Sequence, residues 1–293
     1  MKSITTALLV VGTAQLSSGT LASTAPQATD SLLSQGKTYA YDFTAGTHGW
    51  TGRFADLPVE HDPDDYMLTW GFEPAPVGVG RALRIAADNR SDDISMMFAR
   101  RITGLIPNAR YAVSGTIDYL YNATLDSSGI GGSPGASVYL RYGAILDEPT
   151  TRIDEIEHIR WDNLDMGNQA DPGGENGIMI GPIGTPPGSG EGVWLPQNRS
   201  YTNDPAHPFF IAFAAPDASA WLIFGTESGF EGFNNIFYTA ATFTFQLSPN
   251  PANWAEPVSA ADAFDLLTFL NAAQQRRTKA DIAAPVEHDP DDY

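Results

Sequence analysis

Apolar and β-branched residues recur at every second position in several segments between residues 39 and 247. In Tyr111–Tyr119 the large apolar side chains fall mostly on odd positions, and in Thr242–Leu247 they again alternate with polar ones. This period of two gives a strand one buried and one wet face. Clusters of Gly, Pro, Asn and Asp separate the segments, as turns separate strands. We predict ten strands: Tyr39–Phe43, Met67–Trp70, Ala82–Ala86, Ser95–Arg101, Tyr111–Tyr121, Ser137–Ala144, Phe209–Ala214, Trp221–Thr226, Ile236–Tyr238 and Ala241–Leu247.

These strands, with no helical periodicity between them, predict an all-β fold, an antiparallel jelly-roll-like β-sandwich over residues 39–247. The region Asp165–Asn203 is rich in Gly and Pro. We interpret it as a long decorated loop with one short strand at Ile178–Ile180, because structureless loops of this length inside a domain are usually functional or disordered.

The pattern changes after Leu247. Residues 248–251, Ser-Pro-Asn-Pro, read as a linker, and Ala261–Ala273 carries apolar side chains at a spacing of three to four. That spacing predicts a helix. The sandwich should therefore carry a short C-terminal helical appendage within a tail of residues 252–293.

The N-terminus has the pattern of a secretory signal. Lys2 precedes an apolar run and then small residues, so we expect a signal peptide over residues 1–25 and a linker over residues 26–38. No later run reaches the roughly 20 apolar residues of a membrane span. We expect a protein that is secreted, periplasmic or on the cell surface.

Charge and cysteine content narrow the possible partners. The chain has 35 acidic and 16 basic residues, a formal net charge of −19, and no cysteine. An acidic protein lacks the Lys and Arg clusters that bind phosphate backbones, so we expect no nucleic-acid partner. Disulfides and cysteine-ligated metals are ruled out by composition. The acidity suits solubility, and it also suits calcium binding.

One segment occurs twice. Pro58–Tyr66 is identical to Pro285–Tyr293 at the end of the chain. In one interpretation the tail takes the place of its twin in another molecule, which would make it a self-association element. In the other, which we favour, the second copy is a recombination or sequence-assembly scar, because it stops abruptly and is too polar to bury much area.

The tail resembles a known type of module. Residues 252–257, Ala-Asn-Trp-Ala-Glu-Pro, followed by Asp262–Asn271, resemble the short duplicated C-terminal modules, related to dockerins, of exported bacterial proteins. The resemblance implies a degenerate dockerin-like unit over residues 252–293 with a truncated second repeat. Ala255 and Pro257 stand where a calcium loop has oxygen ligands, so it does not imply calcium binding there.

The main body also carries a resemblance. Tyr41-Asp42-Phe43 leads to Gly49-Trp50, and Leu222–Gly232 follows much later. With these segments, residues 39–247 resemble a group of uncharacterised bacterial secreted proteins and lipoproteins with no assigned activity. The Asp-Phe and Gly-Trp opening is also similar to the first strand of carbohydrate-binding jelly rolls.

Aromatic and amide side chains suggest a ligand. Trp161 and Trp194 lie in the loop-rich middle of the chain, as do Asn168 and Gln169. Indole rings supply stacking area for sugars and amides bond their hydroxyl groups. The leading hypothesis is an exported, non-catalytic binding or surface-associated module whose ligand is a carbohydrate, either a polysaccharide or a cell-surface glycan.

Two alternatives remain open. In a carbohydrate-active hydrolase, paired carboxylates would do the chemistry, and Glu227 and Glu231 are the pair to test first. A tight turn with solvated acids is the simpler interpretation of these two residues, and we favour it. In a structural exoprotein, the tail would mediate attachment or self-association. We favour a protein that is not an enzyme.

Two acidic clusters offer hard oxygen ligands. Neither matches a calcium-loop motif, and a solvated acidic turn is the simpler interpretation. A structural calcium ion is the one cofactor the sequence suggests. The candidate ligands are Asp62, Asp64, Asp65, Asp92 and Asp93.

Overall fold

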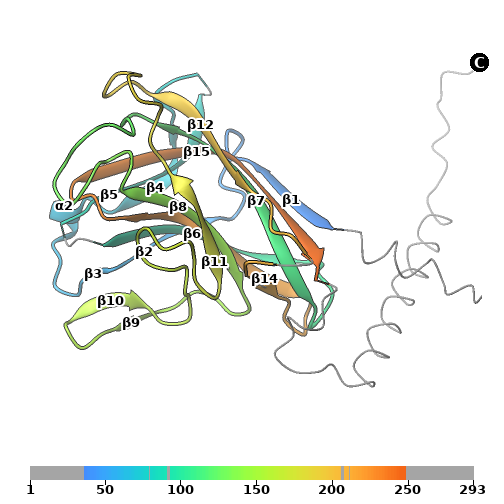
Figure 1. Ribbon diagram of the computed structural model, residues 1–293. Coiled ribbons are helices and arrows are strands. Elements are labelled where there is room, and N and C mark those ends of the chain that lie inside the picture. The colour runs from blue at the N-terminus through green and yellow to red at the C-terminus, as the bar shows by residue number, and fades with distance from the viewer. Residues whose placement is uncertain (1–35, 79, 91–92, 206–207, 211, 249–293) are drawn as a thin grey trace, which may run out of the picture.

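The computed structural model describes residues 36–78, 80–90, 93–205, 208–210 and 212–248. Two antiparallel sheets pack face to face, which confirms the jelly-roll-like β-sandwich (Figure 1). The predicted signal peptide, tail helix, dockerin-like unit and second copy of the repeat lie outside the described residues. Among the described residues, no helix has the length and apolarity needed to cross a membrane.

The first sheet has seven strands, in the order β12-β7-β15-β5-β4, with β1 paired to β15 and β13 paired to β7. The long strand β15 pairs along its length with β7, and a bulge lies between Tyr238 and Ala240. Its strands are β1 (Lys37–Asp42), β4 (Thr69–Pro74), β5 (Arg81–Asp88), β7 (Arg110–Tyr121), β12 (Leu195–Tyr201), β13 (Ala212–Phe213) and β15 (Phe233–Leu247).

The second sheet has five strands, in the order β11-β8-β14-β6-β2, and a small three-stranded sheet, β3-β10-β9, lies beside it. The β9–β10 hairpin projects near β2 (Figure 1). The five strands are β2 (Thr51–Ala55), β6 (Ile94–Thr103), β8 (Val138–Ile145), β11 (Gly177–Pro182) and β14 (Ser219–Ser228). The small sheet contains β3 (Leu57–Pro58), β9 (Thr151–Ile153) and β10 (His158–Trp161).

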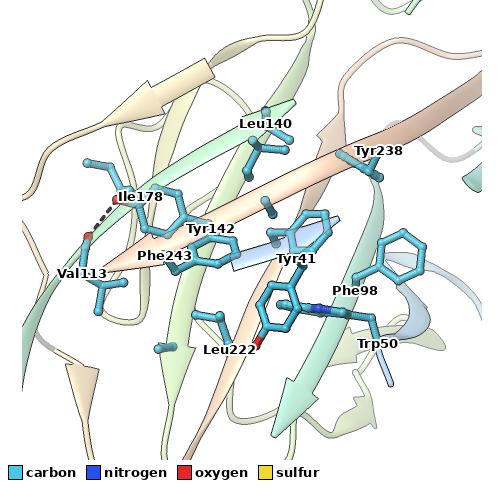
Figure 2. Close-up of a cluster of buried hydrophobic side chains, with 14 of the residues drawn as sticks. Tyr41, Trp50, Phe98, Val113, Leu140, Tyr142, Ile178, Leu222, Tyr238 and Phe243 are labelled. Carbon is cyan, nitrogen blue, oxygen red and sulfur yellow. Dashed lines mark hydrogen bonds between the residues drawn. The ribbon is translucent and has the colours of Figure 1, made fainter. Parts of the chain in front are cut away.

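An aromatic core fills the space between the sheets (Figure 2). Trp50 is fully buried in this core, with its ring centroid 4.8 Å from that of Phe224 in an edge-on arrangement, which aromatic quadrupoles favour. Tyr142 crosses from β8 and donates a hydrogen bond of 2.8 Å to the Val113 carbonyl on the opposite sheet. A Cβ at Gly115 would lie 2.7 Å from the Tyr142 ring, so this glycine makes the crossing possible.

The five-stranded sheet is buried on both faces. On β6, Met96 and Phe98 face the sandwich core, while Met97 and Ala99 face the other way into a second apolar cluster. Leu164, from the segment after β10, packs on that outer cluster together with Trp161 and Met166. This covering segment, residues 162–176, therefore lies over the outer face of the sheet.

Several local expectations differ from the structure. The predicted loop over residues 165–203 contains β12 as well as the predicted short strand, now β11. Strand β12 alternates half-buried and exposed residues at a sheet edge, so its sequence has too few apolar residues to mark it. Ile236–Tyr238 and Ala241–Leu247 form one bulged strand rather than two.

The first copy of the repeat is folded. It spans the end of β3 and the short helix α2 (Pro63–Tyr66), where the Asp62 carboxylate caps the helix by accepting from the Asp64 backbone N–H at 2.9 Å. Tyr66 is buried against the sandwich. Asp62, Asp64 and Asp65 are exposed.

Candidate functional site

A cavity of about 470 Å³ opens over the outer face of the five-stranded sheet. Three parts of the chain build it: the ends of β6 and β14, the β9–β10 hairpin, and the covering segment. Its volume is within the range of small-molecule sites in proteins. The lining residues are Asp56, Asp93, Ser95, Met97, Arg152, Asp154, Arg160, Trp161, Leu164, Asp165, Met166, Gly167, Asn168, Asp171 and Glu227.

Trp161 supplies the aromatic wall. It ends β10, packs against the outer apolar cluster and is half-buried. Its indole Nε1–H donates to the Ser95 hydroxyl of β6 at 2.9 Å. That bond holds the ring in a set orientation within the cavity lining, as a pre-formed ligand platform requires.

The floor of the cavity contains a buried ion pair. Arg141 of β8 is fully buried, and its Nε lies 3.3 Å from Oε2 of Glu227 on the neighbouring strand β14. The other guanidinium nitrogens donate to the carbonyls of Met166 and Gln169 in the covering segment. A single buried arginine thus joins the sheet to the segment above it.

Gln169 completes this connection. Its backbone N–H donates to Glu227 Oε1 at 3.0 Å, and its side-chain amide donates to Asp93 Oδ1 at 2.7 Å. Its φ is 40°, in the left-handed region that non-glycine residues rarely adopt. Gln169 therefore orients the carboxylates and is not among the residues that line the cavity.

A second ionic group lies at the hairpin side. The Arg160 guanidinium contacts Asp56 at 3.0 Å, Asp154 at 3.1 Å and Asp93 at 3.9 Å. Asp154 also accepts backbone N–H groups of its own hairpin. Arg160 therefore fixes the β10 strand, and with it Trp161, beside the residues that precede β3 and β6.

Two carboxyl groups have raised pKa values. Burial raises the pKa of Glu227 to about 7, although Arg141 and the Gln169 N–H oppose the shift. Burial likewise raises the pKa of Asp56 to about 6, against the opposing effect of Arg160. Raised carboxyl pKa values in a cleft are typical of functional sites, and buried structural networks also produce them.

These shifts predict the pH dependence of stability. Between about pH 4.5 and 7 the folded state holds protons that unfolded Glu227 and Asp56 have released. The free energy of unfolding should therefore fall as pH rises through this window. Groups with lowered pKa values, such as Asp154, have the opposite effect below about pH 4. There the free energy of unfolding should fall as the pH decreases.

Urea unfolding at intervals from pH 4.5 to 8 measures the slope of the free energy of unfolding against pH. We expect Glu227→Gln to flatten it and the exposed Glu60→Gln to leave it unchanged. An identical slope in wild type and Glu227→Gln would show that Glu227 does not hold a proton in this range.

The structure separates the sequence-predicted sugar contacts. Trp161 and Asn168 line the cavity, and Gln169 lies behind it. Trp194 lies with Phe237 on the outer face of the seven-stranded sheet, the two ring centroids 5.2 Å apart. The two tryptophans therefore belong to different faces of the sandwich, and a ligand role for Trp194 stays a prediction.

The predicted carboxylate pair is also divided. Glu227 lies in the cavity floor, whereas Glu231 is half-buried in the turn after β14, bridged to Ile130 and outside the cavity lining. The carboxylates that do share the cavity with Glu227 include Asp56 and Asp93. Asp56 and Asp93 are far from Glu227 in the sequence, so only the tertiary structure shows that the three share one cavity.

The calcium candidates do not converge. Asp93 lies in the cavity, far along the chain from the exposed Asp62, Asp64 and Asp65, and Asp92 is outside the described residues. In the part of the chain that the structure describes, no group of three or more His, Cys, Asp or Glu side chains is arranged to hold a metal. The calcium site stays a prediction.

One serine has the spacing of a nucleophile elbow, Gly-x-Ser-x-Gly, which the sequence analysis did not identify. Ser133 lies within Gly131–Gly135. Its hydroxyl accepts from the backbone N–H groups of Gly135 and Ala136 and lies 3.0 Å from the Ser127 hydroxyl. These contacts assign Ser133 to a local turn, away from the strand-to-helix position that an elbow occupies.

Arg141 was not predicted as a site residue, although the sequence contains a signal for it. Arg141 interrupts the apolar strand Val138–Ile145, and Glu227 ends another apolar run. A charged side chain within a buried strand needs a partner of opposite charge, so each could have been paired with the other. Nothing comparable marks Asp56 or Arg160, which lie in short polar strands and turns.

Comparisons with known proteins give low similarity. No protein-family model and no curated protein matches the chain. Among solved structures, the CBM22-1 xylan-binding domain of Paenibacillus barcinonensis Xyn10C is 12% identical, with a TM-score of 0.32, covering 73% of this chain and 97% of that one. The mannan-recognising module TmCBM27 is 10% identical, with a TM-score of 0.32, covering 72% and 98%.

An adhesin domain gives a similar result. The K1 cleaved adhesin domain of Lys-gingipain from Porphyromonas gingivalis W83 is 11% identical, with a TM-score of 0.30, covering 71% of this chain and 98% of that one. Likenesses at these identities and TM-scores do not indicate a ligand for this chain.

Proposed function

We propose that this protein is an exported, non-catalytic binding module that takes a carbohydrate in the cavity beside Trp161. The proposal rests on the combination of aromatic, amide and charged residues that line one cavity. A fixed indole, the Asn168 amide and several carboxylates and guanidinium groups line the same 470 Å³ cavity. Sugars present apolar ring faces and dense hydroxyl groups, which such a mixed lining matches.

The buried network favours binding over hydrolysis. A glycosidase needs one carboxyl group to protonate the leaving oxygen and a second to act as base or nucleophile. Here Glu227 is 6% exposed and accepts from Gln169 while paired with Arg141. Those contacts engage both of its oxygens within the fold, so we assign Glu227 to holding the covering segment in place.

The test is a binding survey with a parallel assay for hydrolysis. We expect the full chain to be retarded in gels that contain a recognised soluble polysaccharide, and to give saturable calorimetric titrations with oligosaccharides of it. Reducing ends should not be released from the same polymers. Absence of binding to every glycan would overturn the proposal, and release of reducing ends that Glu227→Gln abolishes would establish the hydrolase in its place.

A further inference from the structure

The cavity has an excess of negative charge. Six carboxyl groups line it, but Glu227 is paired with Arg141, and both Glu227 and Asp56 have raised pKa values. The four others still outnumber the two guanidinium groups of the lining, and they belong to Asp93, Asp154, Asp165 and Asp171. Arg152 adds little within the hollow, because it is more than half exposed and pairs at 3.8 Å with the equally exposed Asp162. Screening by water reduces the effect of such a surface pair.

The imbalance is greatest around Arg160. One guanidinium lies within 4 Å of three carboxylates, those of Asp56, Asp154 and Asp93. These three carboxyl groups therefore share one guanidinium group. Asp93 has the longest contact, 3.9 Å, and its second hydrogen bond comes from the neutral Gln169 amide.

The carboxylates of the cavity differ in how many hydrogen bonds they accept from the fold itself. Asp165 accepts the backbone N–H groups of Gly167 and Glu175, and Asp171 accepts that of Asn168. These two acids shape the covering segment. Asp56 and Asp93 instead both contact Arg160 in the cavity lining. Repulsion from Asp93 contributes to the raised pKa of both Asp56 and Glu227.

We propose that the sugar taken by this cavity carries a protonated amine, as a deacetylated hexosamine does, and that the ammonium group lies between Asp93 and the Trp161 ring. This inference rests on the proposed function. An ammonium group would offset the unbalanced carboxylates, and it also interacts favourably with an indole face. A uronate would add a further negative charge to the cavity, and an N-acetyl group would bring no charge.

The experiment compares three tetrasaccharides by calorimetry at pH 6: glucosamine, N-acetylglucosamine and galacturonate oligomers. We expect the amine to bind at least tenfold more tightly than its acetylated form and the uronate to bind most weakly. Raising NaCl from 50 to 500 mM should reduce the preference, because it depends on charge.

Two variants show whether the cavity is responsible. Asp93→Asn should lower affinity for the amine about tenfold and change affinity for the acetylated sugar less than twofold. Asp147→Asn removes an exposed carboxylate outside the cavity lining. It should leave both affinities unchanged, which controls for general attraction to an acidic protein.

The outcomes separate the two proposals. Equal affinity for the amine and the acetylated sugar, or a preference for the uronate, would overturn the amine preference while leaving carbohydrate binding intact. An amine preference that Asp93→Asn and Asp147→Asn reduce equally would also overturn it. Binding of none of the three sugars, nor of any glycan in the wider survey, would overturn both.

Discussion

Replacing Arg141 with methionine is expected to lower the free energy of unfolding by about 3 to 5 kcal/mol at pH 8, the usual cost of removing one partner of a buried ion pair. The substitution leaves the Glu227 carboxylate buried without a counter-charge. It also removes the donors that reach the carbonyls of Met166 and Gln169. Urea unfolding monitored by circular dichroism measures the loss.

The pH and a second substitution distinguish this mechanism from a simple packing defect. At pH 5.5 the loss should shrink, because a protonated Glu227 has no charge to leave uncompensated. The double variant Arg141→Met with Glu227→Met should recover part of the stability at pH 8. Arg152→Met, which breaks an exposed pair, should cost less than about 1 kcal/mol. A loss at Arg141 below about 1 kcal/mol would contradict the role assigned to the pair.

The second large effect concerns the ligand. Trp161→Ala is expected to weaken binding of the recognised oligosaccharide roughly 30-fold. An indole face that covers roughly 80 Å² of apolar sugar surface contributes about 2 kcal/mol at 25 cal/mol per Å², and about 1.4 kcal/mol corresponds to a factor of ten. Calorimetric titration of wild type and variant gives the ratio directly.

Trp194→Ala is the matched control. Trp194 is also a half-buried indole, but it lies on the other sheet beside Phe237. Its removal should change affinity less than twofold. Trp161→Phe keeps a ring in the lining and should retain an intermediate affinity, which separates loss of stacking from loss of folding. A Trp194→Ala effect larger than that of Trp161→Ala would place the ligand on the seven-stranded sheet.

The sandwich was predictable because its strong strands show their pattern directly. In β7, Val113 and Ile117 alternate with Ser114 and Thr116, as one buried and one less buried face require. Strands β9, β10 and β12 could not be found in this way. They are short or polar, with half-buried or exposed residues throughout.

The site was predictable only in part. Trp161 stood out as an aromatic residue in a loop-rich region, and Glu227 as an acid worth testing. Their neighbours come from distant parts of the chain, so no spacing in the sequence joins Asp56 or Asp93 to Arg160. The burial that raises the pKa of Glu227 depends on the covering segment, which only tertiary packing places over the sheet.

Whether the ligand binds in the cavity beside Trp161 can be read from the indole N–H resonances of the protein. The chain has six tryptophans, and single substitutions assign their signals in a proton–nitrogen correlation spectrum. During titration with the recognised oligosaccharide, the Trp161 resonance should shift and saturate with the calorimetric dissociation constant, while that of Trp194 stays in place. A saturating shift at Trp194 with none at Trp161 would instead place the ligand on the outer face of the seven-stranded sheet.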